Sequence, residues 1–356
     1  MKIGFLGLPG SGKTTIFNAL TGSDVSVGGY GSTKAEPNLA VVTVGDERVD
    51  RLAEMYLPKK IIHATIECVD FVGFSEGSAR NGGFSASQMA LVKTMDALAL
   101  VLRNFPDDIE GEPDPLRDLD ALETELLLTD LIMVEQRLER ITHTIERGKK
   151  TPELQAEQTI LVRLQEWLNE NRSLRDMDFS DEENRIISGF QFVSKKPVLV
   201  IVNSSETNFG KNDALIRALE QRFRVIEFAG AFEMELCRLS DEEEAKLFMD
   251  DMGISESARS RLTRFAYETL GYISFLTVGS DEVRAWTLRR GETALDAAGT
   301  IHSDLARGFI RAECFSYDDF IACGSEKAVK EQGKFRLEGK DYVVHDGDIL
   351  NIRFSV

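Results

Sequence analysis

The residues Gly7–Thr14 read Gly-Leu-Pro-Gly-Ser-Gly-Lys-Thr and match the phosphate-loop pattern G-x-x-x-x-G-K-[ST]. The apolar run Lys2–Leu6 before this loop predicts a strand, and Thr15–Leu20 after it predicts a helix. A strand, a glycine-rich turn and a helix N-terminus together aim backbone N–H groups and a helix dipole at one point. This arrangement predicts a nucleoside triphosphate site, whereas the alternative is an ordinary glycine turn before a helix.

Two side chains of the loop have distinct expected roles. Lys13 is long enough to reach the β- and γ-phosphates, and the hydroxyl of Thr14 is a ligand for Mg²⁺, the expected cofactor. The residues of the loop that we expect to bind the nucleotide are Gly10, Ser11, Gly12, Lys13, Thr14 and Thr15.

Composition limits the other classes of function. The chain has 356 residues, enough for two or three domains, and a net charge of −18, which argues against nonspecific nucleic-acid binding and gives no sign of DNA specificity. Four cysteines without a C-x-x-C pair and four scattered histidines argue against a zinc site. We see no membrane span and no secretory signal, and therefore expect a cytoplasmic protein with no membrane partner.

Apolar runs alternate with helical patterns in much of the chain, which predicts a doubly wound α/β sheet. Such sheets bind ligands at the carboxyl ends of their strands, here just after Leu6, Asp70 and Val202. The further expected strands are Leu39–Val44, Thr65–Asp70, Ala97–Leu102, Val198–Val202 and Arg224–Phe228, and the expected helices include Asp46–Met55 and Ala86–Lys93.

A helical hairpin interrupts this pattern. Apolar residues with a 3.5-residue period run from Leu127 to Ile145, and Thr151-Pro152 then starts a returning helix with Thr as its cap. The tip between them carries Arg147, Lys149 and Lys150, which form either a contact surface or a solvated turn.

The last part of the chain predicts a small mixed sheet that carries a helix. The segments that we expect there are strands at Ile273–Val278, Glu282–Thr287, Lys340–Val344 and Ile349–Phe354, and a helix at Ala294–Gly299. The expected division is an NTPase domain in two parts (1–116 and 178–270), a helical insertion (117–177) and a C-terminal domain (271–356).

Asp70-Phe71-Val72-Gly73 forms a second nucleotide element at a strand end. We expect the Asp70 carboxylate to hold magnesium through a water and the Gly73 N–H to contact the γ-phosphate. Phe74 follows where many GTPases carry the glutamine that orients the attacking water. Hydrolysis is therefore expected to be slow unless a partner or ion supplies that interaction; Phe74 is also suited to filling core space.

Asn203-Ser204-Ser205-Glu206 stands where a base-reading N-K-x-D motif is expected. Ser204 replaces the lysine that covers the base, and Glu206 is one methylene longer than the usual aspartate. Both changes weaken guanine recognition, so we expect Asn203 and Glu206 to favour adenine; the alternative is a solvated polar loop. In the glycine-rich loop Gly28–Asn38, Thr33 is a candidate magnesium ligand.

These elements resemble the YchF family, also called Obg-like ATPases, over essentially the whole chain. Besides the motifs above, the resemblance rests on Glu36-Pro37-Asn38, Asp46-Glu47-Arg48, Val283–Thr287, Ala297–Asp304, Gly308–Glu313 and Gly339–Val344. It implies an ATPase that tolerates GTP, a hydrophobic residue in place of the catalytic glutamine, a C-terminal TGS domain and association with ribosomes or RNA.

The chain departs from the family's pattern at three places and is read as a divergent member or paralogue. Its loop reads Gly10–Thr15 in place of Asn-Val-Gly-Lys-Ser-Thr, Lys34 occupies the position of the family's magnesium threonine, and Leu100 stands where a histidine is frequent. The last two leave open whether Thr33 or Lys34 faces the magnesium.

Three functions follow as hypotheses. The first is an ATP-hydrolysing switch on ribosomes, with Lys13 and Gly73 as catalytic residues. The second is a nucleotide-sensing module that hydrolyses little, favoured by Phe74, Leu100 and Lys34. The third is a small-molecule phosphotransferase, against which the Asp70–Gly73 motif counts. The sequence does not determine the oligomeric state.

Overall fold

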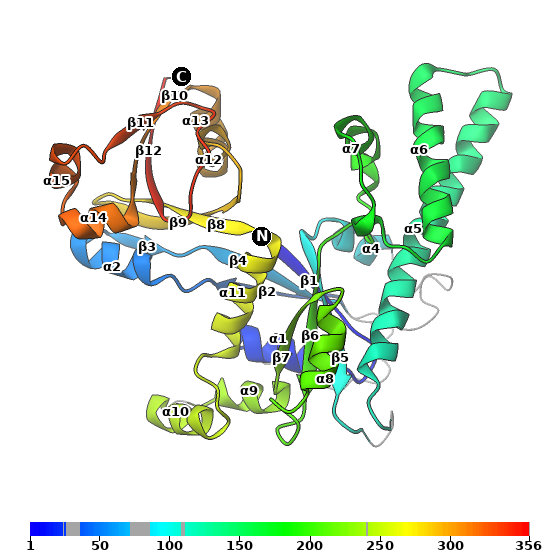
Figure 1. Cartoon of the computed structure of the whole chain (residues 1–356), viewed down its shortest axis with the longest axis horizontal. Helices are drawn as coiled ribbons and strands as arrows, with labels where there is room; N and C mark the ends of the chain where they lie inside the picture. Colours follow the sequence, from blue (N-terminus) through cyan, green and yellow to red (C-terminus); the bar gives the residue numbers. More distant parts are fainter. Residues whose placement is uncertain (24, 26–35, 72–85, 108–110, 240, 356) are drawn as a thin grey trace. The chain divides into compact units, whose positions relative to one another are not determined.

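The computed structural model describes residues 1–23, 25, 36–71, 86–107, 111–239 and 241–355 (Figure 1). The chain divides into two compact units. One unit comprises Lys2–Ala40 and Glu67–Ala258, and the other comprises Met1, Val41–Ile66 and Arg259–Val356.

A six-stranded sheet with the order β2-β4-β1-β5-β6-β7 organises the first unit. β1 pairs in parallel with β4 and β5, and β5, β6 and β7 continue in parallel. The strands are β1 (Lys2–Leu6), β2 (Asn38–Thr43), β4 (Thr65–Asp70), β5 (Ala97–Asn104), β6 (Val198–Ser204) and β7 (Arg224–Phe228). All six strands predicted for this domain are present, and the P-loop α/β fold is confirmed.

Helices cover this sheet and connect its strands. Those of the first unit are α1 (Lys13–Thr21), α4 (Ala86–Lys93), α5 (Pro115–Glu146), α6 (Pro152–Asn169), α7 (Asp181–Ile187), α8 (Asp213–Glu220), α9 (Gly230–Leu236) and α10 (Glu242–Asp251). Short 3-10 turns lie at Leu174–Asp176 and Ser188–Phe190.

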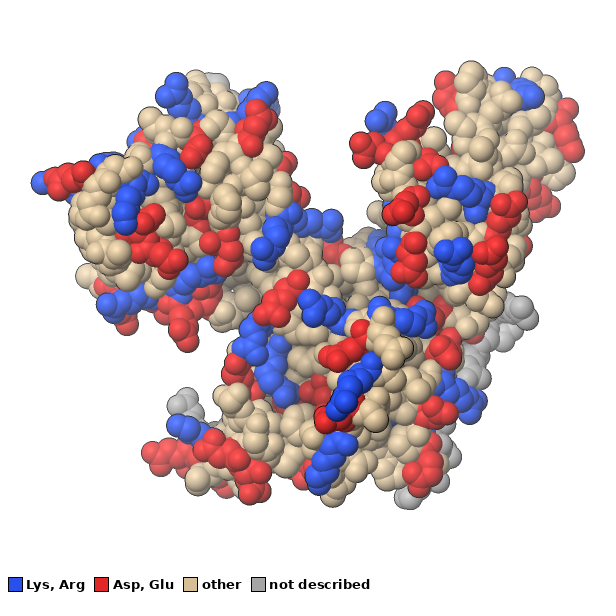
Figure 2. Space-filling view, in the orientation of Figure 1, with Lys and Arg blue, Asp and Glu red and all other residues tan. Residues whose placement is uncertain are grey.

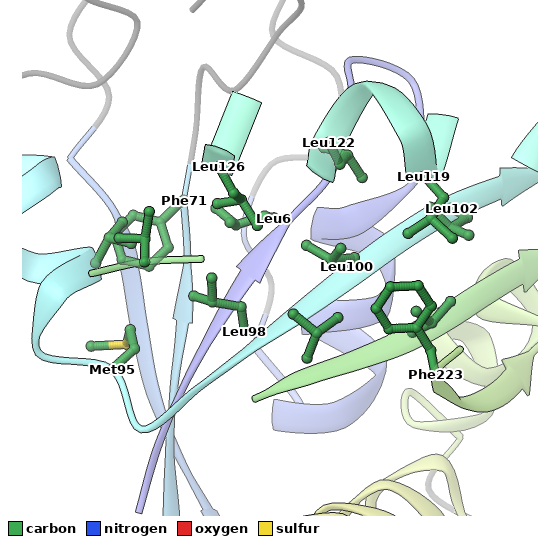
Figure 3. Packing of buried hydrophobic residues seen from close by; sticks show 14 of the residues in the cluster. Leu6, Phe71, Met95, Leu98, Leu100, Leu102, Leu119, Leu122, Leu126 and Phe223 are labelled. Carbon is green, nitrogen blue, oxygen red and sulfur yellow. The ribbon is translucent and has the colours of Figure 1, made fainter. Parts of the chain in front are cut away.

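The core of the sheet is built on β5, whose eight residues are all buried. Leu98, Leu100 and Leu102 alternate along the strand, so that their side chains lie on one face (Figure 3). Leu119 and Leu122 from the start of α5 pack against them. Because each such buried leucine contributes about 1.5–3 kcal/mol, the first turns of α5 are held firmly on the sheet.

Beyond this base, α5 and α6 form the antiparallel hairpin that the sequence predicts (Figure 1). Thr151 caps α6 through a bond from the Leu154 amide, and Pro152 occupies its first turn. The apolar seam is buried between the helices, and Arg137 donates two bonds of 2.7 and 2.8 Å to Glu157 across it.

The second unit contains a mixed sheet with the order β11-β10-β12-β8-β9-β3. Its strands are β3 (Lys60–Ile62), β8 (Tyr272–Thr277), β9 (Glu282–Arg289), β10 (Phe309–Ser316), β11 (Arg336–Glu338) and β12 (Asp348–Phe354). Its helices are α2 (Glu47–Tyr56), α11 (Ala258–Leu270), α12 (Ala294–Ile301), α13 (Ser303–Arg307), α14 (Tyr317–Cys323) and α15 (Glu326–Glu331), of which α11 begins at the last residue of the first unit.

One segment from the N-terminal half of the chain belongs to this second unit. β3 pairs in parallel with β9, and Arg48 of α2 donates a 2.7 Å bond to Asp346. Tyr56 also donates a 2.7 Å bond to Glu326. Nothing in the sequence indicated that residues 41–66 pack with the C-terminal residues.

The expected strand at Lys340–Val344 is wrong. This segment forms a turn with a single bridge between Thr293 and Val343. Its carbonyl groups accept from the first amides of α12: Tyr342 from Ala294 at 2.8 Å, and Lys340 from Leu295 at 3.2 Å. The segment therefore supplies acceptors for the first amides of α12. The sheet instead contains β10 and β11, which the sequence did not predict.

None of the described helices combines the length and the apolar character that crossing a membrane would require.

Candidate nucleotide-binding site

The phosphate loop connects β1 directly to α1. Gly12 ends the loop with φ +74°, and α1 begins at the next residue, Lys13. No side chain among the described residues caps this helix, and the Ile16 amide is bonded to the Gly12 carbonyl at 3.0 Å. The amides of the first turn thus remain available for an anion, as a phosphate site at a helix N-terminus requires.

Asp70 is the centre of the polar contacts beside this loop. Its side chain is completely buried at the end of β4 and forms an ion pair with the Lys13 ammonium group. Its second carboxylate oxygen accepts from Thr14 Oγ1 at 3.0 Å and from Asn38 Nδ2 at 3.1 Å. The end of β4 and the starts of α1 and β2 therefore meet at one carboxylate.

The oxygen atoms at this point suit a magnesium ion. The Thr14 hydroxyl and the Asp70 carboxylate are hard donors 3.0 Å apart, the kind of ligand that Mg²⁺ prefers. Within the described ranges no group of three or more His, Cys, Asp or Glu side chains forms a metal site. Such a sparse donor set fits a cation that binds together with substrate phosphates and water.

Asn203 joins the base-reading segment to the phosphate loop. This side chain is 3% exposed; its Nδ2 donates to the Ser11 carbonyl at 3.0 Å and its Oδ1 accepts from the Gly230 amide at 3.1 Å. A Cβ atom on Gly12 would lie 2.2 Å from Nδ2, and one on Gly230 would lie 2.6 Å from Oδ1. Only glycine at both positions lets the Asn203 amide reach the loop.

Gly230 is a candidate functional residue that the sequence patterns did not identify. It directly follows Ala229 at the carboxyl end of β7, where a ligand-binding turn is expected in a parallel sheet. The sequence Ala229-Gly230-Ala231 after a predicted strand was the signal that could have found it.

The two other residues of the base-reading motif have different environments. Ser204 is 3% exposed, and its hydroxyl donates to Glu227 at 2.5 Å and accepts from Asn104 at 2.8 Å. Glu206 is exposed. Ser204 is thus part of a buried network, while Glu206 is free to contact a ligand.

The remaining predicted site residues are distributed as follows. Gly10 is exposed, Thr15 is buried in α1, and Ser11 is 2% exposed with a hydroxyl that bonds to no described residue. Leu100 lies in the core of the sheet. The positions that fall outside the described residues are Thr33, Lys34, Gly73 and Phe74.

Two family models match the chain. Residues 2–137 match the model described as "50S ribosome-binding GTPase", and residues 272–355 match the YchF C-terminal model, described as "Protein of unknown function (DUF933)".

Individual relatives match the chain over its full length. The Ribosome-binding ATPase YchF of Haemophilus influenzae is 38% identical over 100% of this chain and 99% of the relative. Obg-like ATPase 1 of Gallus gallus is 35% identical over 100% of this chain and 92% of the relative. The solved structure of the Schizosaccharomyces pombe YchF GTPase superposes with a TM-score of 0.81 at 33% identity, covering 99% of this chain and 97% of that one. The chain therefore belongs to the YchF family.

Proposed function

We propose that this protein is an ATPase of the P-loop type that acts as a nucleotide-dependent switch in association with ribosomes. The observation that carries the proposal is the convergence of Lys13 and Thr14 on the buried carboxylate of Asp70, beside the uncapped N-terminus of α1. GTP is the tolerated second nucleotide, and Mg²⁺ is the cofactor.

Binding of a triphosphate exchanges the partners of two side chains. The first-turn amides of α1 bind phosphate oxygens, and Lys13 leaves Asp70 to contact the β- and γ-phosphates. Thr14 and Asp70 would hold a magnesium ion, which would supply positive charge against the phosphates. Gly73, three residues beyond Asp70, is proposed to contact the γ-phosphate and to respond to its loss.

Adenine preference is proposed from the base-reading segment. Guanine recognition of the N-K-x-D type needs a lysine that covers the base and an aspartate that accepts from it. Ser204 supplies no such cover, because its hydroxyl is bonded inside the protein, and Glu206 is one methylene too long. ATP should therefore bind at least as tightly as GTP.

Association with the ribosome is supported by the bacterial relatives, which are named ribosome-binding ATPases. The two regions proposed to make the contact are the hairpin tip, with Arg147, Lys149 and Lys150, and the C-terminal domain, proposed to be a TGS domain. All three tip side chains are exposed. On the face shown in Figure 2, acidic and basic side chains are intermixed, so a contact with ribosomal RNA has to use local basic groups of this kind.

We also propose the domain division 1–116 with 178–270, 117–177 and 271–356, and a cytoplasmic location for the protein. Supporting the insertion, α5 and α6 share an apolar core of their own beyond the base of α5. Residues 41–66 pack with the C-terminal unit although they belong to the NTPase segment in sequence.

A nucleotide sensor that hydrolyses little is the second candidate. One observation favours it: Leu100, at the position where the family resemblance leads us to expect a histidine, is completely buried among apolar side chains. A side chain of that kind cannot orient an attacking water.

Turnover of ATP, measured with and without purified ribosomes, tests the proposal. We expect slow release of phosphate by the protein alone, acceleration by ribosomes, and loss of both in the Lys13→Ala variant. ATP binding without turnover under either condition would favour the sensor, and no Lys13-dependent binding at all would contradict both.

A further inference from the structure

Glu227 lies at the carboxyl end of β7 and holds both ends of the loop that carries Glu206. Its Oε1 accepts from Ser204 Oγ at 2.5 Å and from Asn212 Nδ2 at 2.5 Å. Its Oε2 accepts from the backbone amide of Gly210 at 3.1 Å. One carboxylate thus connects the end of β6 to the residues immediately before α8.

Ser204 is the first anchor of this network. Its hydroxyl donates to Glu227 and accepts from Asn104 Nδ2 at 2.8 Å and Asn212 Nδ2 at 3.3 Å. A hydroxyl offers one hydrogen and two lone pairs, so the bonding capacity of Ser204 is filled. Ser204 and Asn104 are 3% and 7% exposed, which makes the loss of any partner costly.

Asn212 is the second anchor. It stands at the N-cap position of α8, yet its side chain makes no capping bond to that helix. Its amide instead donates to Glu227 and to the Asn208 carbonyl at 2.7 Å. An asparagine that would ordinarily stabilise a helix start is therefore used to fix the loop.

Between the anchors, hydrogen bonds among the loop's own residues add further support. The amides of Asn208 and Phe209 both bond to the Ser205 carbonyl, at 3.0 and 2.9 Å, and form one turn. Glu206, Thr207 and Asn208 are exposed. The position of Glu206 relative to Asn203 and the phosphate loop thus depends on the two anchors and on the carboxylate that joins them.

We infer that Glu227 is the positioning residue for nucleobase recognition: it fixes the Ser204–Asn212 loop so that Glu206 meets the base of a nucleotide seated on the phosphate loop. The inference rests on the proposed function. It assigns to Ser204 an inward structural role in place of the base-covering role of a lysine, and it separates recognition of the base from binding of the phosphates.

The test compares ligands with and without a base. The Glu227→Gln variant keeps the size of the side chain and replaces one acceptor oxygen by a donor that faces other donors. We expect its affinity for ATP to fall about tenfold, or about 1.4 kcal/mol, and the ratio of its affinities for ATP and GTP to move towards one. Inorganic tripolyphosphate, measured by displacement of a fluorescent nucleotide, should bind as in wild type. Glu220→Gln, at an exposed glutamate of α8, is the matched control; it should change neither the affinity for ATP nor the ratio of the affinities for ATP and GTP.

Equal losses for ATP and tripolyphosphate, or an unchanged ATP affinity, would overturn the inference. If Glu227→Gln fails to fold, Ser204→Ala and Asn212→Ala each remove one anchor and should lower ATP affinity without changing tripolyphosphate affinity. The Lys13→Ala variant separates the inference from the proposed function. If the Lys13→Ala substitution weakens the binding of both ligands but the Glu227→Gln substitution has no effect, only the inference is contradicted. If the Lys13→Ala substitution leaves binding unchanged, the proposed function is contradicted.

Discussion

The ammonium group of Lys13 lies on the carboxylate of Asp70, with the two side chains 10% and 0% exposed. These residues are separated by 57 positions in sequence and come from the start of α1 and the end of β4. A buried charge pair is costly to break unless new partners replace the old ones. In the proposed function, a triphosphate with its magnesium would supply such partners to both residues at once, and this exchange of partners would be the central event of binding.

Asp70→Asn should remove most of the magnesium dependence of nucleotide binding. The amide has no charge to attract a cation, while Lys13 and the first turn of α1 still bind phosphate. Calorimetric titration of ATP in the presence of magnesium and of a chelator should show a large difference in wild type and a small one in the variant. A variant with the full magnesium effect would contradict the role of Asp70.

Gly230→Ala should weaken ATP binding and destabilise the fold by about 1–3 kcal/mol, the usual cost of overpacking. The new methyl group would lie 2.6 Å from Asn203 Oδ1 and 2.7 Å from the Ile16 side chain. Gly189→Ala is the control, because a Cβ there meets nothing within 4 Å. Chemical unfolding and ATP titration of both variants check this expectation, and equal behaviour of the two would show that the Asn203 contact is not tight.

Asp130 should make stability depend on pH. Burial raises the pKa of Asp130 to about 6, although Val193 N, Ser194 N and Ser194 Oγ all donate to its carboxylate. Between the ordinary carboxyl pKa of 3.8 and about 6, the folded protein therefore keeps a proton on Asp130 that the unfolded chain has released. This contribution to stability is present at low pH and is lost as the pH rises through about 6.

The difference in unfolding free energy between wild type and Asp130→Asn isolates this effect. As the pH increases from about 4 to about 7, the unfolding free energy of the wild type should fall relative to that of Asp130→Asn. A flat profile for Asp130→Asn would show that the carboxyl group titrates equally in both states.

Neutralising Arg147, Lys149 and Lys150 together should weaken co-sedimentation with ribosomes and reduce its salt dependence, because fewer phosphate contacts release fewer counterions. The affinity for ATP should not change, since the tip is built by the hairpin and not by the sheet. A triple variant of the exposed residues Arg185, Lys211 and Arg217 removes the same charge elsewhere. Full ribosome binding by the tip variant would leave the C-terminal domain as the remaining candidate.

The sequence predicted the sheet of the first unit well because its strands are long apolar runs that tertiary packing reinforces. Burial of all eight residues of β5 is the clearest case. Prediction failed where a segment's partners are distant: β3 pairs with β9, more than 200 positions later, and nothing local in Lys60–Ile62 indicates this. At Lys340–Val344 the alternating pattern predicted a strand, but the backbone caps α12 instead.

In the candidate site, too, residues in local motifs were predicted and residues with distant partners were not. The phosphate loop and Asp70 were found from motifs, since each is a short segment next to a strand. Gly230 and Glu227 were not, because their roles depend on side chains of Asn203 and Ser204 that reach them only across neighbouring strands. The spacing of residues within one segment does not predict hydrogen bonds between side chains on neighbouring strands.

Calorimetric titration of ATP into wild type and the Lys13→Ala variant, with magnesium present, tests the central claim most directly. Lys13 is the only side-chain cation of the phosphate loop, and a hydrogen bond to a charged partner contributes about 1.5–3 kcal/mol. We predict that the variant, although folded, binds ATP at least about tenfold more weakly than wild type. An unchanged dissociation constant would contradict the assignment of Gly7–Thr14 as the nucleotide site.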